Sequence, residues 1–376
     1  MAYPALSIVM PCHNRAYDLA RVLDSYEEQS GEGTFELIAV DDASQDETYD
    51  LLKSYNPTRF TIRVERLYVN QGPAAARNKG ISLARAPLIL FVGDDIVPDR
   101  NLVRGHIAAH RRYRENNDAV LGYVAWPDSM PVNTLMRHID GMGAEQFSYY
   151  YLKDGEAYDF RHFYTANISI KKEFLYRLDR WFDTDFPYAA FEDVELAYRL
   201  SKNGLRIVYS SHLSGEHYHY HNIWTFSNRQ YRSGLMACVL AKKHPETAKI
   251  VVGRSFWLRS AYWRALAAAG RYPSSDTDWL ESETLHLLSA YEWKKNPLID
   301  QLYLRVLNYY YQKGLIYGNF GETPLARRIH DVFARRALIP GLSWFFNESE
   351  RIQGWVPEDQ GPWILNRFST SNNSLT

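Results

Sequence analysis

The sequence has 376 residues and a formal net charge of −1 at pH 7. This length supports one large domain plus a smaller one, or two domains, and the balanced charge excludes a whole-chain attraction to nucleic acid. The two cysteines, Cys12 and Cys238, are too few for a disulfide framework and show no zinc-site spacing, so we expect a reducing, cytoplasmic setting. No stretch resembles a signal peptide or a membrane span.

The first hundred residues alternate between strand and helix patterns. Strands are predicted at 5–11, 35–40, 60–67 and 87–92. Helices are predicted at 17–29 and 74–86, with another that Ser44 caps and that runs through Lys53. This βαβαβαβ order predicts an α/β fold with a mostly parallel sheet flanked by helices.

The order of elements becomes less regular after Gly122. We expect strands at 165–171 and 205–210 with a helix at 191–203 between them. From Trp224 onward the pattern is almost wholly helical, broken at the prolines Pro245, Pro273 and Pro297. The predicted organisation is therefore an α/β domain over 1–223 and a helical region over 224–376.

Acidic and imidazole side chains cluster at the predicted strand ends. Asp41-Asp42 and Asp94-Asp95 each follow an apolar strand, where ligands bind in parallel sheets. An acidic pair precedes the 191–203 helix, and three histidines alternate after the next strand: Glu192, Asp193, His217, His219 and His221. Carboxylates and imidazoles suit a divalent cation that holds a diphosphate. A remaining carboxylate can take a proton, which indicates a metal-assisted transferase that uses an activated phosphate donor.

Five ordered segments carry a more specific resemblance. They are SIVMPCHNR, LIAVDDASQDET, NQGPAAARNKGI, ILFVGDDIVPD and FEDVELAYRL, spread over residues 7–200. Together they resemble the inverting family-2 nucleotide-sugar glycosyltransferases with a GT-A (Rossmann-like) fold. The resemblance implies that a sugar moves from a nucleotide diphosphate donor to an acceptor hydroxyl by a single in-line displacement. A carboxylate would act as base, and Mn²⁺ or Mg²⁺ would act as cofactor.

The resemblance also implies a nucleotide site. Its expected residues are Pro11, His13, Asn14, Arg15, Asp41, Asp42, Gly72, Arg77 and Asp94. An anionic acceptor at Asp41-Asp42 suits the imide N–H of uracil or thymine, so a UDP- or TDP-sugar is favoured. The alternatives are a polar turn at 13–15, a helix cap at Asp41-Asp42 and a solvated helix face at Arg77.

In the same family the second acidic block binds metal and the third supplies the base. Asp95 is the expected metal ligand, although Gly93 stands where the usual Asp-x-Asp motif has its first carboxylate. His217 is the expected second ligand and His219 the reserve. Asp193 is the first choice as catalytic base and Glu192 the second. Acidic residues in a first helical turn also complement the helix dipole, which is the alternative for this pair.

The acceptor side carries less sequence signal. Asn167, Trp181 and His219 are candidates for contacts with the donor or acceptor sugar, although turn formation and core packing are alternatives. The acceptor would be a glycan, a lipid-linked glycan or a protein, and the oligomeric state is not encoded. Residues 226–272 carry nine Lys or Arg against one acid, which is compatible with peripheral membrane docking.

Two other functions compete with the glycosyltransferase. A nucleotidyltransferase would need a glycine-rich phosphate loop, and neither GxxxxGK[ST] nor GxGxxG occurs in the sequence. A catalytically silent sugar-binding protein of the same fold would be expected to lack Asp95 and the Glu192-Asp193 pair, and all three residues are present.

Overall fold

The protein is described by a computed structural model that covers residues 3–31, 34–141, 146–253, 261, 264–265, 268, 277–294, 296 and 298–353. The chain forms two compact units. The first, here the α/β unit, comprises Met1–Val132 and Gln146–Tyr220. The second, here the helical unit, comprises Asn133–Glu145 and His221–Thr376. Residues 133–141 thus pack with the C-terminal part of the chain, which no sequence pattern indicated.

The α/β unit is built on one mixed sheet with the order β3-β2-β1-β4-β8-β6-β9-β5, in which β7 also pairs with β9. Its strands are β1 (Leu6–Cys12), β2 (Phe35–Asp42), β3 (Thr61–Leu67), β4 (Leu88–Val92), β5 (Ile96–Pro98), β6 (Asp118–Ala125), β7 (Ala157–Tyr158), β8 (Asn167–Lys171) and β9 (Arg206–His217). The first four strands are parallel to one another. β8 runs antiparallel to β4 and β6, while β6 and β9 are parallel.

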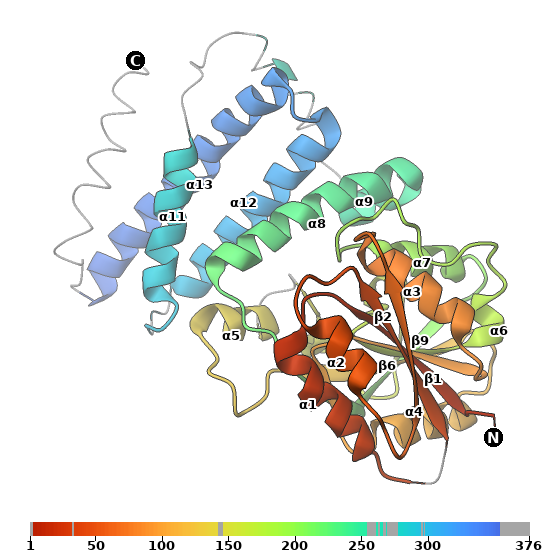
Figure 1. The fold of residues 1–376 in the computed structure, drawn as a ribbon. Helices are drawn as coiled ribbons and strands as arrows, with labels where there is room; N and C mark the ends of the chain where they lie inside the picture. Colours follow the sequence, from red (N-terminus) through yellow and green to blue (C-terminus); the bar gives the residue numbers. More distant parts are fainter. Residues whose placement is uncertain are drawn as a thin grey trace, which may run out of the picture. The chain divides into compact units, whose positions relative to one another are not determined.

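Helices cover both faces of this sheet (Figure 1). On one face lie α1 (Ala16–Glu27), α2 (Thr48–Ser54) and α4 (Leu102–Arg112), and on the other lie α3 (Gly72–Leu83), α6 (Lys172–Leu175) and α7 (Glu192–Ser201). Alternation along β1 sends Ile8 to the α1 side and Val9 to the α3 side, and both are fully buried. Short 3-10 turns occur at Tyr149–Tyr151 and Phe160–His162. The predicted α/β class with flanking helices is confirmed.

Most predicted elements of the first hundred residues lie within a few residues of the observed ones, with one local correction. Ser44 does not cap the second helix, because α2 begins at Thr48 after Glu47. The Ser44 hydroxyl instead accepts a hydrogen bond from the Asn14 backbone N–H at 2.9 Å. Ser44 therefore joins two loops at the carboxyl ends of β1 and β2.

The helical unit contains α5 (Thr134–Asp140), α8 (Ile223–Lys243), a 3-10 turn at Pro245–Thr247, α9 (Ala248–Val251), α11 (Asp278–Tyr291), α12 (Ile299–Phe320) and α13 (Pro324–Gln353). α8 and α12 cross closely: a Cβ on Gly234 would lie 2.1 Å from the Tyr311 carbonyl oxygen. Their contact therefore requires glycine. The predicted helical character of the C-terminal region is confirmed over the described residues, whereas Pro273, Pro297 and 354–376 lie outside them.

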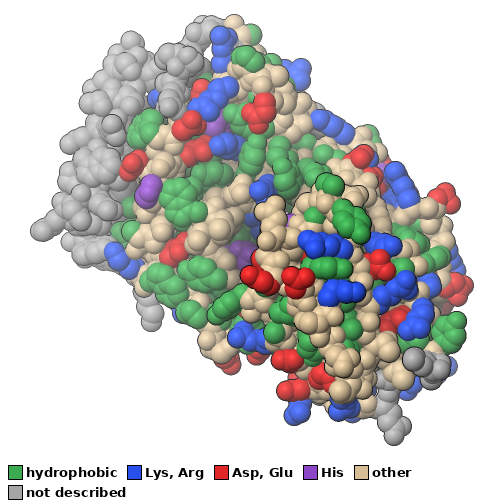
Figure 2. Space-filling view, in the orientation of Figure 1, with side chains coloured by type: hydrophobic (Ala, Val, Ile, Leu, Met, Phe, Trp, Pro, Cys, Tyr) green, Lys and Arg blue, Asp and Glu red, His purple; other side chains and the backbone are tan. Residues whose placement is uncertain are grey.

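None of the helices in the described part of the chain is both long and apolar enough to span a bilayer. On the face shown in Figure 2, the described lysine, arginine, aspartate and glutamate side chains are interspersed. Part of the basic 226–272 segment, including Arg254 and Arg259, lies outside the described residues.

Candidate active site

The turn after β1 joins the first and fourth sequence blocks. The Arg15 guanidinium lies 3.4 Å from an Asp94 carboxylate oxygen and 3.3 Å from an Asp95 oxygen. The His13 backbone N–H donates to Asp94 at 3.2 Å. Asn14, at the tip of the turn, adopts a left-handed backbone with φ 50°. Residues 13–15 and 94–95 therefore form one charged surface where β1 and β4 end, and Pro11 lies in β1 just before it.

The two carboxylates that end β2 have separate partners. Asp42 accepts hydrogen bonds from the backbone N–H groups of Gln71 and Gly72, both at 2.8 Å. It therefore satisfies donors at the start of α3, not α2. Asp41 is completely buried, and its Oδ2 lies 3.1 Å from the Arg66 guanidinium.

Gly72 must be glycine for two reasons. Its φ is +83°, and a Cβ there would lie 2.8 Å from the Pro187 carbonyl oxygen. The close approach lets α3 begin directly beside Asp42. The structure thus assigns Gly72 a conformational need, whether or not a nucleotide approaches its backbone.

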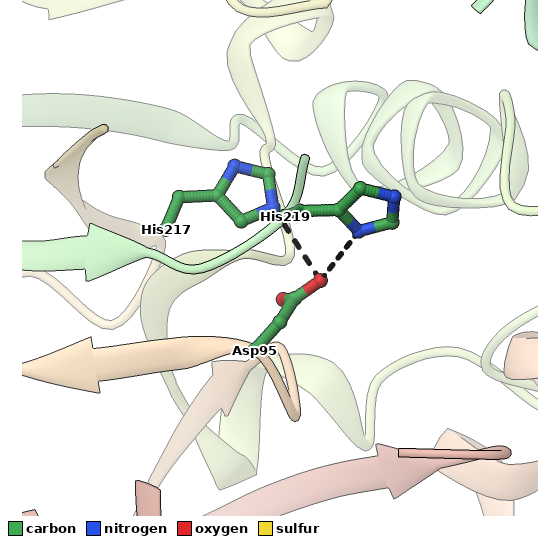
Figure 3. A group of neighbouring side chains, drawn as sticks. All are labelled: Asp95, His217 and His219. Carbon is green, nitrogen blue, oxygen red and sulfur yellow. Dashed lines mark hydrogen bonds and ion pairs between the residues drawn. The ribbon is translucent and has the colours of Figure 1, made fainter. Parts of the chain in front are cut away.

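Asp95, His217 and His219 converge on one point (Figure 3). The Asp95 Oδ2 lies 3.4 Å from His217 Nε2 and 2.9 Å from His219 Nδ1. One ligand atom from each residue falls within 4.8 Å of the others, so the three can hold a metal ion. Burial opposes ionisation, but His217 and His219 hold the pKa of Asp95 well below its usual range.

The local backbone explains this convergence. β5 directly follows Asp95 and runs antiparallel to β9, with Ile96 opposite His217. A Cβ on Gly93 would lie 2.6 Å from Asp95 Oδ1, so a larger residue there would crowd the carboxylate. The indole of Trp126 stacks on the His217 ring with centroids 4.9 Å apart and planes 14° from parallel.

The other carboxylate of the pair, Asp94, behaves differently from Asp95. Burial raises the pKa of Asp94 to about 6, and the nearby Asp95 charge adds to the rise while Arg15 opposes it. Asp94 is thus bound to the β1 turn by its hydrogen bond from His13, whereas Asp95 faces the histidines.

The acidic pair at the start of α7 also divides into two roles. Glu192 is buried and accepts a charge-assisted hydrogen bond from Arg77 at 2.9 Å. Asp193 is half-buried, and the hydrogen bond found for its side chain among the described residues comes from the Val194 backbone N–H. Burial raises the pKa of Asp193 to about 7, and the neighbouring Glu192 charge adds to this rise.

The backbone is strained directly before this acidic pair. Phe191, the residue before the pair, adopts a left-handed conformation with φ 66° and ψ −6°. Aromatic residues rarely occupy this region, and such strain persists at sites that the surrounding structure holds in place. The strained residue turns the chain into α7 immediately before the two carboxylates.

Aromatic rings pack in a row beside His217. The Phe147 ring lies 6.2 Å from the His217 ring and 5.1 Å from the Tyr164 ring, measured between centroids. Burial raises the pKa of Tyr164 to about 12, and the Asp193 charge contributes to the rise. Trp126, Phe147 and Tyr164 therefore form a row of aromatic rings beside His217.

The structure also places Asn167 and Trp181, the candidates for sugar contacts, and His221, the last of the three histidines. Asn167 is completely buried, with its amide bonded to Tyr123 and Leu213 carbonyls, so it does not face a sugar site and that expectation is corrected. Trp181 packs against Tyr176 with ring centroids 4.9 Å apart. His221 is buried within the helical unit.

Sequence reasoning did not identify Arg66, Trp126 or Phe147. No local pattern could reveal Arg66, because its partner lies on the neighbouring strand. Local sequence offered only a weak signal for Trp126, which directly follows β6.

Comparisons with known proteins agree with this geometry. Residues 7–178 match the family model described as Glycosyl transferase family 2. The chain is 30% identical over 230 residues to validoxylamine A glucosyltransferase of Streptomyces hygroscopicus subsp. jinggangensis, covering 55% of this chain and 54% of that protein. It is 35% identical over 125 residues to a PGL/p-HBAD biosynthesis glycosyltransferase of Mycobacterium bovis, covering 33% of this chain and 48% of that protein.

A solved structure shares the fold. The mannosyltransferase PcManGT from Pyrobaculum calidifontis, in complex with GDP-Man and Mn²⁺, superposes with a TM-score of 0.54 at 16% identity, covering 86% of this chain and 89% of that one. This chain spans about half the length of the curated relatives it matches. The family model, the relatives and the shared fold agree with the five sequence blocks: residues 7–178 belong to glycosyl transferase family 2, and the α/β unit has the GT-A fold.

Proposed function

We propose that this protein transfers a sugar from a nucleoside-diphosphate sugar to an acceptor hydroxyl, with inversion at the anomeric carbon. The proposal rests on the different surroundings of the two carboxylates at the start of α7. The Arg77–Glu192 ion pair neutralises one buried carboxylate, and Asp193 remains half-buried without a cationic hydrogen-bond partner among the described side chains. A carboxylate with a pKa of about 7 is suited to take a proton at neutral pH.

The proposed step is a single displacement. The acceptor hydroxyl oxygen forms a bond to the anomeric carbon while the bond from that carbon to the diphosphate oxygen breaks. The hydroxyl proton passes to an Asp193 carboxylate oxygen, and the electron pair of the broken bond leaves with the diphosphate. General-base assistance of this kind contributes roughly 10²–10⁴-fold to the rate.

Asp95, His217 and His219 are the residues proposed to hold a divalent cation. A carboxylate oxygen with two imidazole nitrogens within 4.8 Å of one another is a donor set that Mn²⁺ accepts, and the His217 and His219 rings already point at Asp95. When bound, such an ion supplies positive charge that stabilises a departing diphosphate. Arg15 lies 3.3 Å from Asp95 and adds a fixed positive charge at the same place.

For the donor, we keep the expectation of a uridine or thymidine nucleotide. This preference rests on the sequence, because a carboxylate at the end of β2 suits the imide N–H of uracil or thymine. In this structure Asp41 is completely buried and paired with Arg66. The name of the glucosyltransferase relative supports a hexose as the transferred sugar. The acceptor remains a glycan, a lipid-linked glycan or a protein hydroxyl, in the cytoplasm or at its membrane face.

A donor screen tests this proposal. Purified full-length protein is incubated with UDP-, TDP- and GDP-sugars in Mn²⁺, in Mg²⁺ or in excess chelator, and release of nucleoside diphosphate is measured. We expect release with a UDP- or TDP-hexose in the presence of metal, and its loss in the Asp193→Asn variant. Release of a sugar 1-phosphate in place of nucleoside diphosphate would contradict sugar transfer and favour nucleotidyl transfer.

A further inference from the structure

Strand β9 changes its pairing register against β6 part-way along its length. Leu121 pairs with Tyr209, but Tyr123 pairs with Ser214. Because β6 advances by two residues here while β9 advances by five, β9 carries three extra residues at this point. A bulge of this kind bends a strand and redirects the side chains that follow it.

Asn167 spans this interruption. Its side-chain N–H groups donate to the Tyr123 carbonyl at 3.2 Å and to the Leu213 carbonyl at 2.8 Å. Tyr123 belongs to β6 and Leu213 to β9, so one amide joins both strands where their own ladder is broken. Asn167 is completely buried, so these bonds face no competition from water.

Two glycines make room for the bulge. A Cβ on Gly122 would lie 2.3 Å from the Asn167 amide nitrogen and 2.3 Å from the Leu213 oxygen. A Cβ on Gly105, in α4, would lie 2.3 Å from the Leu213 side chain. The Leu213 carbonyl therefore lies against position 122 and the Leu213 side chain against position 105, and the Asn167 bonds depend on the absence of a side chain at 122.

A buried relay of hydrogen bonds fixes the orientation of the Asn167 amide. It runs from Lys171 to His110 (3.2 Å), to Ser169 (2.9 Å), to His106 (2.8 Å) and to the Asn167 oxygen (2.9 Å). The Lys171 ammonium can only donate, and the Asn167 oxygen can only accept, so both ends impose the same direction on every bond. Burial lowers the pKa of His106 to about 4 and that of His110 to about 3, which keeps both rings neutral as this pattern requires.

The residues after the bulge reach the acidic site. Gly215, Glu216 and His217 pair with β5, whose first residue Ile96 follows Asp95. Since side chains alternate along a strand, a one-residue slip of this segment would turn His217 to the opposite face of the sheet. The Tyr218 backbone N–H then donates to the Asp95 carbonyl at 2.8 Å, which continues the alignment toward His219.

We propose that Asn167, oriented by His106, is a positioning residue that fixes the register of the end of β9 and so places His217 and His219 beside Asp95. The importance of that placement for catalysis rests on the proposed function, but the effect on register does not. Asn167 would act through β9 and touch neither sugar nor nucleotide.

The test uses Asn167→Asp, which keeps the size of the side chain but turns an oxygen toward the Tyr123 and Leu213 carbonyls. Amide hydrogen exchange of the metal-free, full-length protein is compared with wild type. We expect exchange at 214–218 to become at least about tenfold faster while β2 keeps its protection. Mn²⁺ affinity, measured by electron paramagnetic resonance with UDP present, should fall by roughly 10–100-fold, as for other residues that orient metal ligands.

Two further variants keep the test decisive. Gly122→Ala displaces the same amide from the other side and should reproduce both effects, so it replaces Asn167→Asp if that variant does not fold. Ile170→Ala removes a buried side chain from the same strand without touching the bulge, so it should lower thermal stability and leave exchange at 214–218 and Mn²⁺ affinity unchanged.

The outcomes separate the two proposals. Unchanged exchange at 214–218 in Asn167→Asp or Gly122→Ala would overturn the positioning role. Faster exchange there, in a protein whose wild type binds no Mn²⁺, would support the positioning role and overturn the metal site of the proposed function.

Discussion

Arg77 and Glu192, 115 residues apart in the sequence, form a buried ion pair with nitrogen and oxygen 2.9 Å apart. The guanidinium also lies over the Phe182 ring, 5.4 Å from its centroid. This pair commits Glu192 to a structural partner and leaves the adjacent Asp193 as the proposed base. It also gives Arg77 a role at α7 that differs from the nucleotide contact expected from the sequence.

The pH dependence of turnover should follow Asp193. Because burial raises the pKa of Asp193 to about 7, the base is protonated in acid and activity should rise with pH through about 7. A kcat profile between pH 5.5 and 9 measures this, with roughly tenfold lower turnover at pH 6 than on the plateau. A profile that is flat over this range would contradict the assignment.

The raised pKa of Asp193 also affects the stability of the fold. Stability should fall as pH rises, whereas activity should increase. The folded-state pKa lies above the unfolded value of 3.8, so the unfolded chain ionises first and stability falls as pH rises from about 4 to 7. Asp193→Asn should therefore be more stable than wild type at pH 8, by on the order of 2 kcal/mol, and equal to it below about pH 4. Chemical denaturation at the two pH values measures the difference, and a destabilised variant at pH 8 would contradict the burial cost.

Metal removal should abolish turnover. Asp95 faces both histidines, so Asp95→Ala and excess chelator should each reduce activity to background. His217→Ala and His219→Ala should be milder, because water can fill one coordination position. Turnover and Mn²⁺ titration of the three variants measure this order. Full activity of the wild type in excess chelator would show that no metal is needed.

A side chain at Gly93 should displace the Asp95 carboxylate, even though the family motif usually has aspartate there. Its added Cβ would lie 2.6 Å from Asp95 Oδ1, so Gly93→Ala and Gly93→Asp should both weaken Mn²⁺ binding by roughly tenfold or more. Gly341→Ala is a matched control, because its Cβ would meet Arg305 only at 3.6 Å. Tighter Mn²⁺ binding by Gly93→Asp would contradict this crowding, because it would show that the site accommodates a further carboxylate at position 93.

The helical unit depends on Glu281, which joins three helices. Its carboxylate lies 2.8 Å from His330 and 2.7 Å from Lys313, and it also accepts from the Tyr309 hydroxyl. Although burial opposes ionisation, His330 and Lys313 lower the pKa of Glu281 to about 2. Glu281→Gln should therefore cost about 3 kcal/mol at pH 7.

The sign of the pH effect provides the control for Glu281. A lowered pKa contributes stability that is present above the unfolded value of 4.5 and is lost as pH falls toward 2. The difference between wild type and Glu281→Gln in denaturant unfolding should shrink over that interval. A difference that stays constant down to pH 2.5 would assign the effect to packing alone.

Local patterns were sufficient for the first half of the sheet and insufficient for the second. β1, β2 and β4 are short apolar runs that end in polar turns, so their positions and the acidic residues after them were predictable. β5 has only three residues, and β6 lies in a stretch that the sequence did not resolve into elements. The expected strand at 205–210 continues through the bulge to His217, which no local pattern indicated.

The roles of site residues were limited in the same way. The sequence placed Asp95 and the histidines in one site, but the distances that bring His219 as near as His217 arise from the pairing of β5 with β9. The sequence assigned Asn167 to sugar binding. The burial of this side chain depends on tertiary packing, which local sequence does not reveal. Arg77 was assigned to the nucleotide because an ion pair across 115 residues leaves no local signal.

The identity of the catalytic base is tested by comparing Asp193→Asn with Glu192→Gln in a sugar-transfer assay, alongside binding of the nucleoside diphosphate. Asp193→Asn keeps the shape of the side chain but cannot take the proton. We predict a fall in kcat of roughly 10²–10⁴ for Asp193→Asn with nearly unchanged nucleotide affinity. Glu192→Gln should lose stability and retain turnover per folded molecule. Full turnover in Asp193→Asn would contradict the role of Asp193 as base, and loss confined to Glu192→Gln would assign that role to Glu192.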